Sequence, residues 1–110
     1  HREIEAICAR RKLTVSFTEL YNSTATPCHP ALMDATEAAI KAQGLPTMRL
    51  PSGAGHDAAT LAPLCPIGMM FMRSTRGISH NPLEWTDPAD IALGAQLLME
   101  TMVRVANEKL

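Results

Sequence analysis

The sequence has little net charge, few aromatic residues and no long hydrophobic run, and each shortage removes a class of function. Ten basic residues nearly balance eleven acidic ones, so an electrostatic hold on nucleic acid or anionic lipid is not expected. No apolar stretch approaches the roughly 20 residues of a membrane-spanning helix, and no basic segment leads into a signal-type apolar run. We therefore expect no nucleic-acid or membrane partner, and a cytoplasmic location.

Cysteines are also scarce. Cys8, Cys28 and Cys65 are odd in number, widely separated and without a Cys-x-x-Cys pair. This pattern favours small buried hydrophobic residues in a reducing compartment over a disulfide or a thiolate site. The length of 110 residues fits one small domain or part of a larger one. The chain begins at His1 without an initiator methionine and already in helical register, which suggests a piece of a longer protein.

Four segments carry helix signals. Residues 2–12 have apolar positions at helical spacing and a basic end, and residues 58–64 are mostly good helix formers. A helix over residues 30–43 starts with a proline and is followed by Gly44 as its C-terminal stop. A last helix of about twenty residues follows the capping side chain of Asp87.

Two of these helices have stripes that should pack. Alanine dominates the stripe of the second helix, which suggests close packing on a sheet. The predicted stripes are Leu32, Ala35, Ala39 and Ala42 in the second helix, and Ile91, Ala95, Leu98, Met102 and Val105 in the last one.

Three segments are predicted to be strands, which makes the expected fold α/β. Residues 13–21 alternate apolar and polar positions, as in a half-buried and antiparallel strand. Residues 45–50 form a short segment limited by prolines. Residues 66–72 are continuously apolar, which indicates a strand covered on both faces.

Two histidines lie in small-residue loops, each after a predicted strand. The first loop reads Leu-Pro-Ser-Gly-Ala-Gly-His-Asp and carries His56, and the second reads Arg-Gly-Ile-Ser-His and carries His80. Glycine allows a close approach of backbone to a ligand, and such loops are common positions for functional residues. The two are too far apart for a local metal motif, and the glycine pattern is not one that binds phosphate. His29 and His1 receive no role.

The motif Ser-Gly-Ala-Gly-His-Asp-Ala at residues 52–58, followed by Gly-Ile-Ser-His-Asn-Pro-Leu-Glu-Trp-Thr at residues 77–86, carries a family resemblance. It resembles the C-terminal part of the N-carbamoyl-L-amino-acid hydrolase, allantoate amidohydrolase and β-ureidopropionase family. These are dizinc amidohydrolases related to aminoacylase-type metallopeptidases. The resemblance is specific from about Gly44 onward.

The resemblance implies an α/β fold in two parts. Residues 1–22 would be the tail of a lid and dimerisation domain, contributing its last helix and strand. Residues 23–110 would be the C-terminal part of a zinc hydrolase catalytic domain, a mixed sheet with flanking helices. A hinge would lie at residues 22–29.

The resemblance also implies site residues. His80 would be a terminal zinc ligand, and His56 would act in catalysis by hydrogen-bonding the carbonyl group under attack, while Gly55 and His56 would bind substrate. The complete enzyme would hold two zinc ions per site, with Mn, Co or Ni as substitutes. Asp57 is expected to have a structural role, and orienting His56 is the alternative. Ser79, Asn81 and Glu84 are expected to be loop hydrogen bonders rather than reacting groups.

The function implied is hydrolysis of linear C–N bonds in N-carbamoyl amino acids or allantoate by metal-activated water. Such a zinc site requires about three protein ligands, and only one is expected here, so the isolated chain should be inactive. The expected partners are the small-molecule substrate, the missing N-terminal part and a second copy that dimerises through the lid. An alternative is a non-catalytic split subunit or a degenerate remnant that supplies fold and association surface. The residues of the first motif argue against a peptidase of the wider superfamily.

Overall fold

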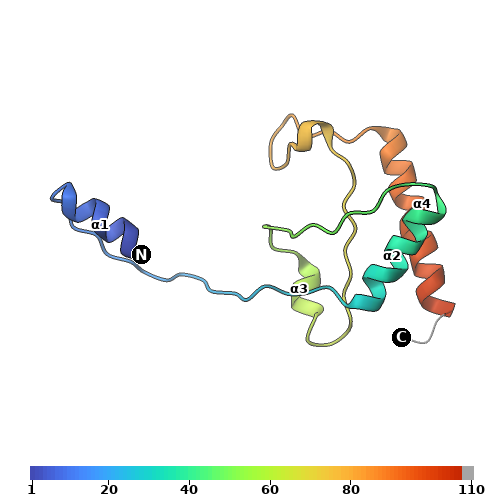
Figure 1. Cartoon of the computed structure of the whole chain (residues 1–110), viewed down its shortest axis with the longest axis horizontal. Helices are drawn as coiled ribbons and strands as arrows, with labels where there is room; N and C mark the ends of the chain where they lie inside the picture. Colours follow the sequence, from blue (N-terminus) through green and yellow to red (C-terminus); the bar gives the residue numbers. More distant parts are fainter. Residues whose placement is uncertain (108–110) are drawn as a thin grey trace.

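The computed structural model describes residues 1–107, and helices provide all of the regular structure in that range. The elements are α1 (Arg2–Arg10), α2 (Pro30–Ala42), α3 (Asp57–Leu61), a 3₁₀ turn η1 (Thr75–Gly77) and α4 (Pro88–Asn107), joined by irregular segments (Figure 1). The four helices predicted from the sequence are therefore confirmed, with α3 shorter than expected.

The ends of α2 and α4 follow from local chemistry. Proline occupies the first position of both helices, where its missing N–H costs nothing. The Asp87 side chain caps α4 by accepting the backbone N–H of Ala89 at 2.9 Å. Gly44 follows α2 with a φ of +70°, and its N–H donates to the carbonyl of Lys41 at 2.9 Å. The predicted start and stop signals are confirmed.

Helices α2 and α4 lie side by side and form the packed centre of the molecule (Figure 1). The buried side chains are Ala35 and Ala39 of α2 and Leu97 of α4, where Gly94 is buried as well. Small residues at a contact allow two helices to approach closely. The alanine-rich face of α2 was predicted to pack on a sheet, and instead it packs on a helix, because no sheet forms within residues 1–107.

The face of α4 that packs on α2 differs from the predicted stripe. Leu97 is only 6% exposed, whereas its neighbour Leu98 on the predicted stripe is 52% exposed. One step along a helix turns the side chain by about 100°, so neighbouring leucines belong to different faces. The stripe was predicted without a named partner, and its members Leu98, Met102 and Val105 line a groove shared with α2 and residues 66–72. Ile91 and Met102 of that stripe are also exposed, at 48% and 63%.

The segments predicted as strands form no β-ladder within the described residues. Residues 13–21, 45–50 and 66–72 run as irregular chain between the helices (Figure 1). A strand is stabilised by hydrogen bonds to a neighbouring strand, and none is present here. Residues 66–72 contact α2, because a Cβ added at Gly68 would lie only 3.0 Å from Cβ of Leu32. The expected cover on both faces is absent among the described residues, since Phe71 is 52% and Met72 49% exposed. The mixed sheet therefore remains a prediction.

Helix α1 and the segment that follows it lie apart from the rest of the molecule (Figure 1). No residue of α1 is buried, and the ring of His1 stacks on Phe17 with centroids 4.0 Å apart. The radius of gyration is 19.7 Å, against about 13 Å for a compact domain of roughly this length. A boundary between residues 1–22 and 23–110 stays a prediction.

The cysteines are less buried than expected. Cys8 and Cys28 are half-buried, Cys65 is exposed, and all three are free thiols. The interpretation as buried hydrophobic residues is thus wrong for Cys65, because the packed centre is too small to reach it. Within residues 1–107, no helix combines the length and apolar character that crossing a membrane requires.

Candidate active site

The hydroxyl of Ser52 organises the first histidine loop. Its oxygen accepts the backbone N–H of Ala54 at 3.2 Å and lies 2.7 Å from Nε2 of His56. His56 has extended backbone angles and immediately precedes α3, whose first residue is Asp57. A carboxylate in a first helical turn interacts favourably with the helix dipole, which is consistent with a structural role for Asp57. His56 is exposed, so its ring is accessible to a ligand.

The glycines of this loop have room around them. A Cβ added at Gly53 or Gly55 would meet no atom within 4 Å, and neither residue has a positive φ. The chain itself therefore does not require glycine at these positions. Glycine at positions 53 and 55 would allow a ligand to approach the backbone closely.

The second histidine is held in an unusual backbone conformation. His80 has a φ of +54°, in the left-handed region that residues with a Cβ seldom adopt. The Glu84 carboxylate accepts the backbone N–H of His80 at 2.8 Å, and Oδ1 of Asn81 accepts the N–H of Leu83 at 2.9 Å. Asn81 and Glu84 are thus confirmed as loop hydrogen bonders, while the same expectation for Ser79 stays a prediction. The His80 residue is exposed.

The second loop projects from a fixed base. The backbone N–H of Thr75 donates to the carbonyl of Trp85 at 2.8 Å, which closes the loop at its two ends. The guanidinium of Arg73 lies 3.0 Å from the carboxylate of Asp90 in the first turn of α4. The segment that leads into the loop is therefore attached to the packed helix pair.

Both loops extend from the side of the molecule opposite α2 and α4 (Figure 1). Within residues 1–107, no hydrogen bond joins His56 to His80, and no three His, Cys, Asp or Glu side chains are grouped to hold a metal ion. A catalytic zinc needs about three protein ligands and an open position. The described residues therefore do not fit a complete zinc centre, although His80 has one imidazole donor to contribute.

Arg49 attaches the chain before the first loop to α2. Its guanidinium lies 2.8 Å from Oδ1 of Asp34 and also pairs with Glu37, which Lys41 contacts at 3.4 Å. The hydrogen bond from Arg49 lowers the pKa of Glu37 from its ordinary value of 4.5, and Glu37 in turn raises the pKa of Arg49. These ion pairs hold the start of residues 50–57 next to α2.

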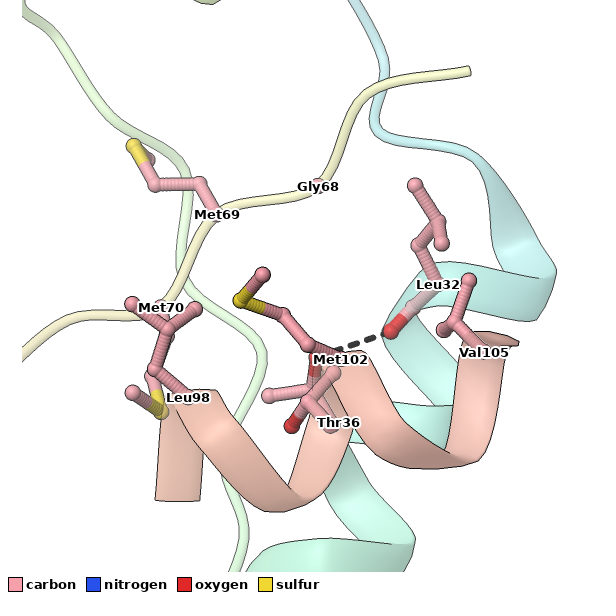
Figure 2. Close-up of a pocket in the computed structure, with 9 residues that line it drawn as sticks. Leu32, Thr36, Gly68, Met69, Met70, Leu98, Met102 and Val105 are labelled. Atoms are coloured by element: carbon pink, nitrogen blue, oxygen red, sulfur yellow. Dashed lines mark hydrogen bonds between the residues drawn. The ribbon is translucent and has the colours of Figure 1, made fainter. Parts of the chain in front are cut away.

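The molecule also has an apolar groove (Figure 2). It has a volume of about 180 Å³ and lies between α2, residues 66–72 and α4. The hydroxyl of Thr36 on its wall donates to the carbonyl of Leu32 at 2.8 Å. Among the described residues that line the groove, none has a titratable side chain and neither candidate histidine is included, so this lining is not suited to acid–base chemistry.

Sequence reasoning did not single out Ser52 or Arg49. Ser52 lies four residues before His56 in a loop, where that spacing has no fixed geometry, so the pattern could not predict their contact. Arg49 reaches partners 12 and 15 residues away. The available signal for Arg49 was the pair of acids on one face of α2, Asp34 and Glu37, which a basic residue could neutralise.

Comparison with known proteins gives consistent matches. The model for peptidase family M20/M25/M40 matches residues 6–104, a range that includes both histidine loops. An N-carbamoyl-L-amino acid amidohydrolase of Geobacillus stearothermophilus is 41% identical over 103 residues, which cover 94% of this chain and 25% of that protein. An allantoate amidohydrolase of Escherichia coli is 31% identical over 107 residues, which cover 97% of this chain and 26% of that protein.

A shorter match has a higher identity. An uncharacterized hydrolase of Haemophilus influenzae is 54% identical over 58 residues, which cover 53% of this chain and 14% of that protein. The chain therefore spans about a quarter, or less, of the length of these curated relatives.

Proposed function

We propose a function for this chain, which belongs to peptidase family M20/M25/M40. Its two histidine loops are part of the active site of a hydrolase of linear C–N bonds. The proposed substrates are N-carbamoyl amino acids or allantoate, the compounds in the names of two relatives. The main support is that the family match spans both loops, and that each loop holds an exposed histidine through a hydrogen bond with a nearby polar side chain.

The two histidines have different proposed roles. His56 donates a hydrogen bond to the carbonyl oxygen of the group under attack, where negative charge develops in the transition state. The backbone at Gly55 lies beside the bound substrate. His80 is one ligand of a zinc centre with two ions per complete site, for which Mn, Co or Ni can substitute.

The remaining ligands of that centre are assigned to residues outside those described. The isolated chain is therefore expected to be inactive, because one imidazole does not hold a catalytic zinc ion. The small-molecule substrate, association of two copies through residues 1–22 and a cytoplasmic location belong to the same proposal.

A chimera tests these roles. The matched region of the Geobacillus stearothermophilus relative is replaced by this chain, and hydrolysis of an N-carbamoyl-L-amino acid and bound zinc are measured. The chimera should be active, and His80→Ala should lose both activity and part of the zinc. His56→Ala should retain zinc and lower kcat by about 10²–10³, the usual cost of removing one donor to an oxyanion.

His29→Ala is the matched control and should change neither zinc content nor activity, because His29 precedes α2 and is given no role. Full activity in His80→Ala, or turnover by the isolated chain, would show that the site is misplaced.

A non-catalytic role is the second candidate, and the lack of a complete metal-ligand group within residues 1–107 favours it. The chain would then be a split subunit that completes another polypeptide, or a remnant with only fold and association surface. Mixing the chain with the preceding part of the Geobacillus protein distinguishes the two. Restored hydrolysis favours a split subunit, and no restoration favours a remnant.

A further inference from the structure

We propose that Ser52 is a positioning residue for His56, because its hydroxyl donates a hydrogen bond to Nε2 and fixes the neutral ring with its proton on Nδ1. This role rests on the proposed function, since it decides which nitrogen of His56 is directed to the substrate carbonyl. Two hydrogen bonds of the first loop carry it, the contact of Ser52 with His56 and the contact of Ser52 with Ala54.

The length of the contact fits a hydroxyl donor. Oγ of Ser52 and Nε2 of His56 are 2.7 Å apart. Hydrogen bonds from a hydroxyl to oxygen cluster at about 2.7–2.8 Å, and those from an N–H to oxygen range over about 2.7–3.2 Å with a mode of about 2.9–3.0 Å. The observed distance is typical of a hydroxyl that donates and lies at the short end for a ring N–H. The distance permits either direction, because the donor and acceptor roles depend on the tautomer of the ring, and we assign Ser52 as the donor and Nε2 as the acceptor.

The second contact of Ser52 supports the same direction. Its oxygen accepts the backbone N–H of Ala54 at 3.2 Å, which occupies one lone pair and leaves the O–H to be donated elsewhere. A hydroxyl that accepts one hydrogen bond becomes a better donor in the next, because the bonds polarise one another. The backbone of the loop thus aligns the hydroxyl toward the ring of His56.

The tautomer follows from the chemistry of imidazole. A neutral ring has one N–H donor and one acceptor nitrogen, so a ring that accepts at Nε2 carries its proton on Nδ1. Within residues 1–107, Nδ1 of His56 has no hydrogen-bond partner, and the residue is exposed. An N–H is what an oxygen with developing negative charge requires, whereas the opposite tautomer would present a lone pair.

The tautomer is measured directly in this chain, without substrate or metal. The protein is labelled with ¹⁵N-histidine, and long-range ¹H–¹⁵N spectra are recorded at a pH where the ring is neutral. We expect the Nδ1 signal of His56 in the protonated, pyrrole-type range and the Nε2 signal in the unprotonated range. Ser52→Ala should move the two signals toward the opposite assignment, the tautomer that free histidine prefers.

Two further variants complete the test. Ser52→Thr retains the hydroxyl and should keep the wild-type shifts, which separates loss of the hydrogen bond from disturbance of the loop. Ser79→Ala, the corresponding serine beside the other histidine, should leave the His56 signals unchanged. In the chimera, Ser52→Ala should lower kcat by about 10–100-fold with little change in KM, and Ser52→Thr should restore it.

The proposed role of Ser52 would be overturned by a wild-type His56 with its proton on Nε2, or by unchanged ¹⁵N shifts in Ser52→Ala. Because the spectra need no turnover, such a result would leave the hydrolase proposal standing. An inactive chimera with the expected tautomer would instead remove the hydrolase proposal and with it the catalytic purpose of the contact.

Discussion

At the scale of single residues, the two candidate histidines are held by hydrogen bonds rather than by burial. The ring of His56 is tied to Ser52, and the backbone of His80 is tied to the carboxylate of Glu84. The left-handed conformation of a non-glycine residue costs of order 1–3 kcal/mol and persists only where neighbouring groups compensate for it. Both residues are exposed, so local polar contacts fix their positions and leave the rings accessible.

Gly55 gives a prediction at this scale. A Cβ at this position meets nothing within 4 Å, so Gly55→Ala should change the free energy of unfolding by no more than about 0.5 kcal/mol. In the chimera the same variant should raise KM, because the added methyl group would obstruct a substrate that lies against the backbone.

Gly53→Ala is the matched control, since the space around Gly53 is equally open. It should change neither stability nor KM. An unchanged KM in Gly55→Ala would remove Gly55 from the proposed substrate site.

At the scale of helices, α2 and α4 make the one helix–helix contact found among the described residues. Within residues 1–107 the buried apolar side chains are Ala35, Ala39 and Leu97, a small set for that length. Several large apolar residues of α4 are exposed, among them Leu98 and Met102 of the groove. The helix is therefore apolar on more than one face, which is why its pattern did not reveal the face that packs on α2.

Adjacent leucines test which face of α4 packs. Leu97→Ala should lower the free energy of unfolding by about 2–3 kcal/mol, because it removes buried methyl groups and leaves a cavity. Leu98→Ala should cost about 1 kcal/mol or less, because the residue is 52% exposed. Urea unfolding followed by far-UV circular dichroism measures both. Equal losses, or a larger loss for Leu98→Ala, would show that Leu97 is not the leucine that α4 buries against α2.

At the scale of the whole molecule, stability should depend on pH through Glu37. Arg49 lowers the pKa of this carboxyl in the folded state from its ordinary value of 4.5. A carboxyl with a lowered folded pKa stabilises the fold above its unfolded pKa, and the contribution is lost as the pH falls through the folded pKa. The free energy of unfolding should therefore begin to decrease as the pH falls to about 4.5 and continue to decrease below it.

Arg49→Gln should lose this part of the pH dependence, as measured by urea unfolding at a series of pH values. Arg10→Gln on α1 is the control, because Arg10 makes no ion pair among the described residues, and it should keep the wild-type profile. Identical profiles for wild type and Arg49→Gln would mean that the pair with Glu37 does not persist in solution.

The family was identified correctly from the two loop motifs, and the matches to the family and to two amidohydrolases confirm it. The residue roles implied by that resemblance remain predictions. In the described part of the chain, neither His56 nor His80 belongs to a group of three side chains that could hold a metal ion. A complete site of this kind depends on residues distant in sequence, which no local motif can supply.

The sequence by itself determined where the helices lie, because a helix is made of hydrogen bonds between residues four apart and its caps are neighbours of its ends. The signals at Pro30, Gly44 and Asp87 were sufficient for that reason. Only the tertiary structure decided that Leu97 rather than Leu98 packs, and that Ser52 contacts His56. It also left the predicted strands unpaired within residues 1–107, because a ladder requires a partner strand that local patterning does not specify.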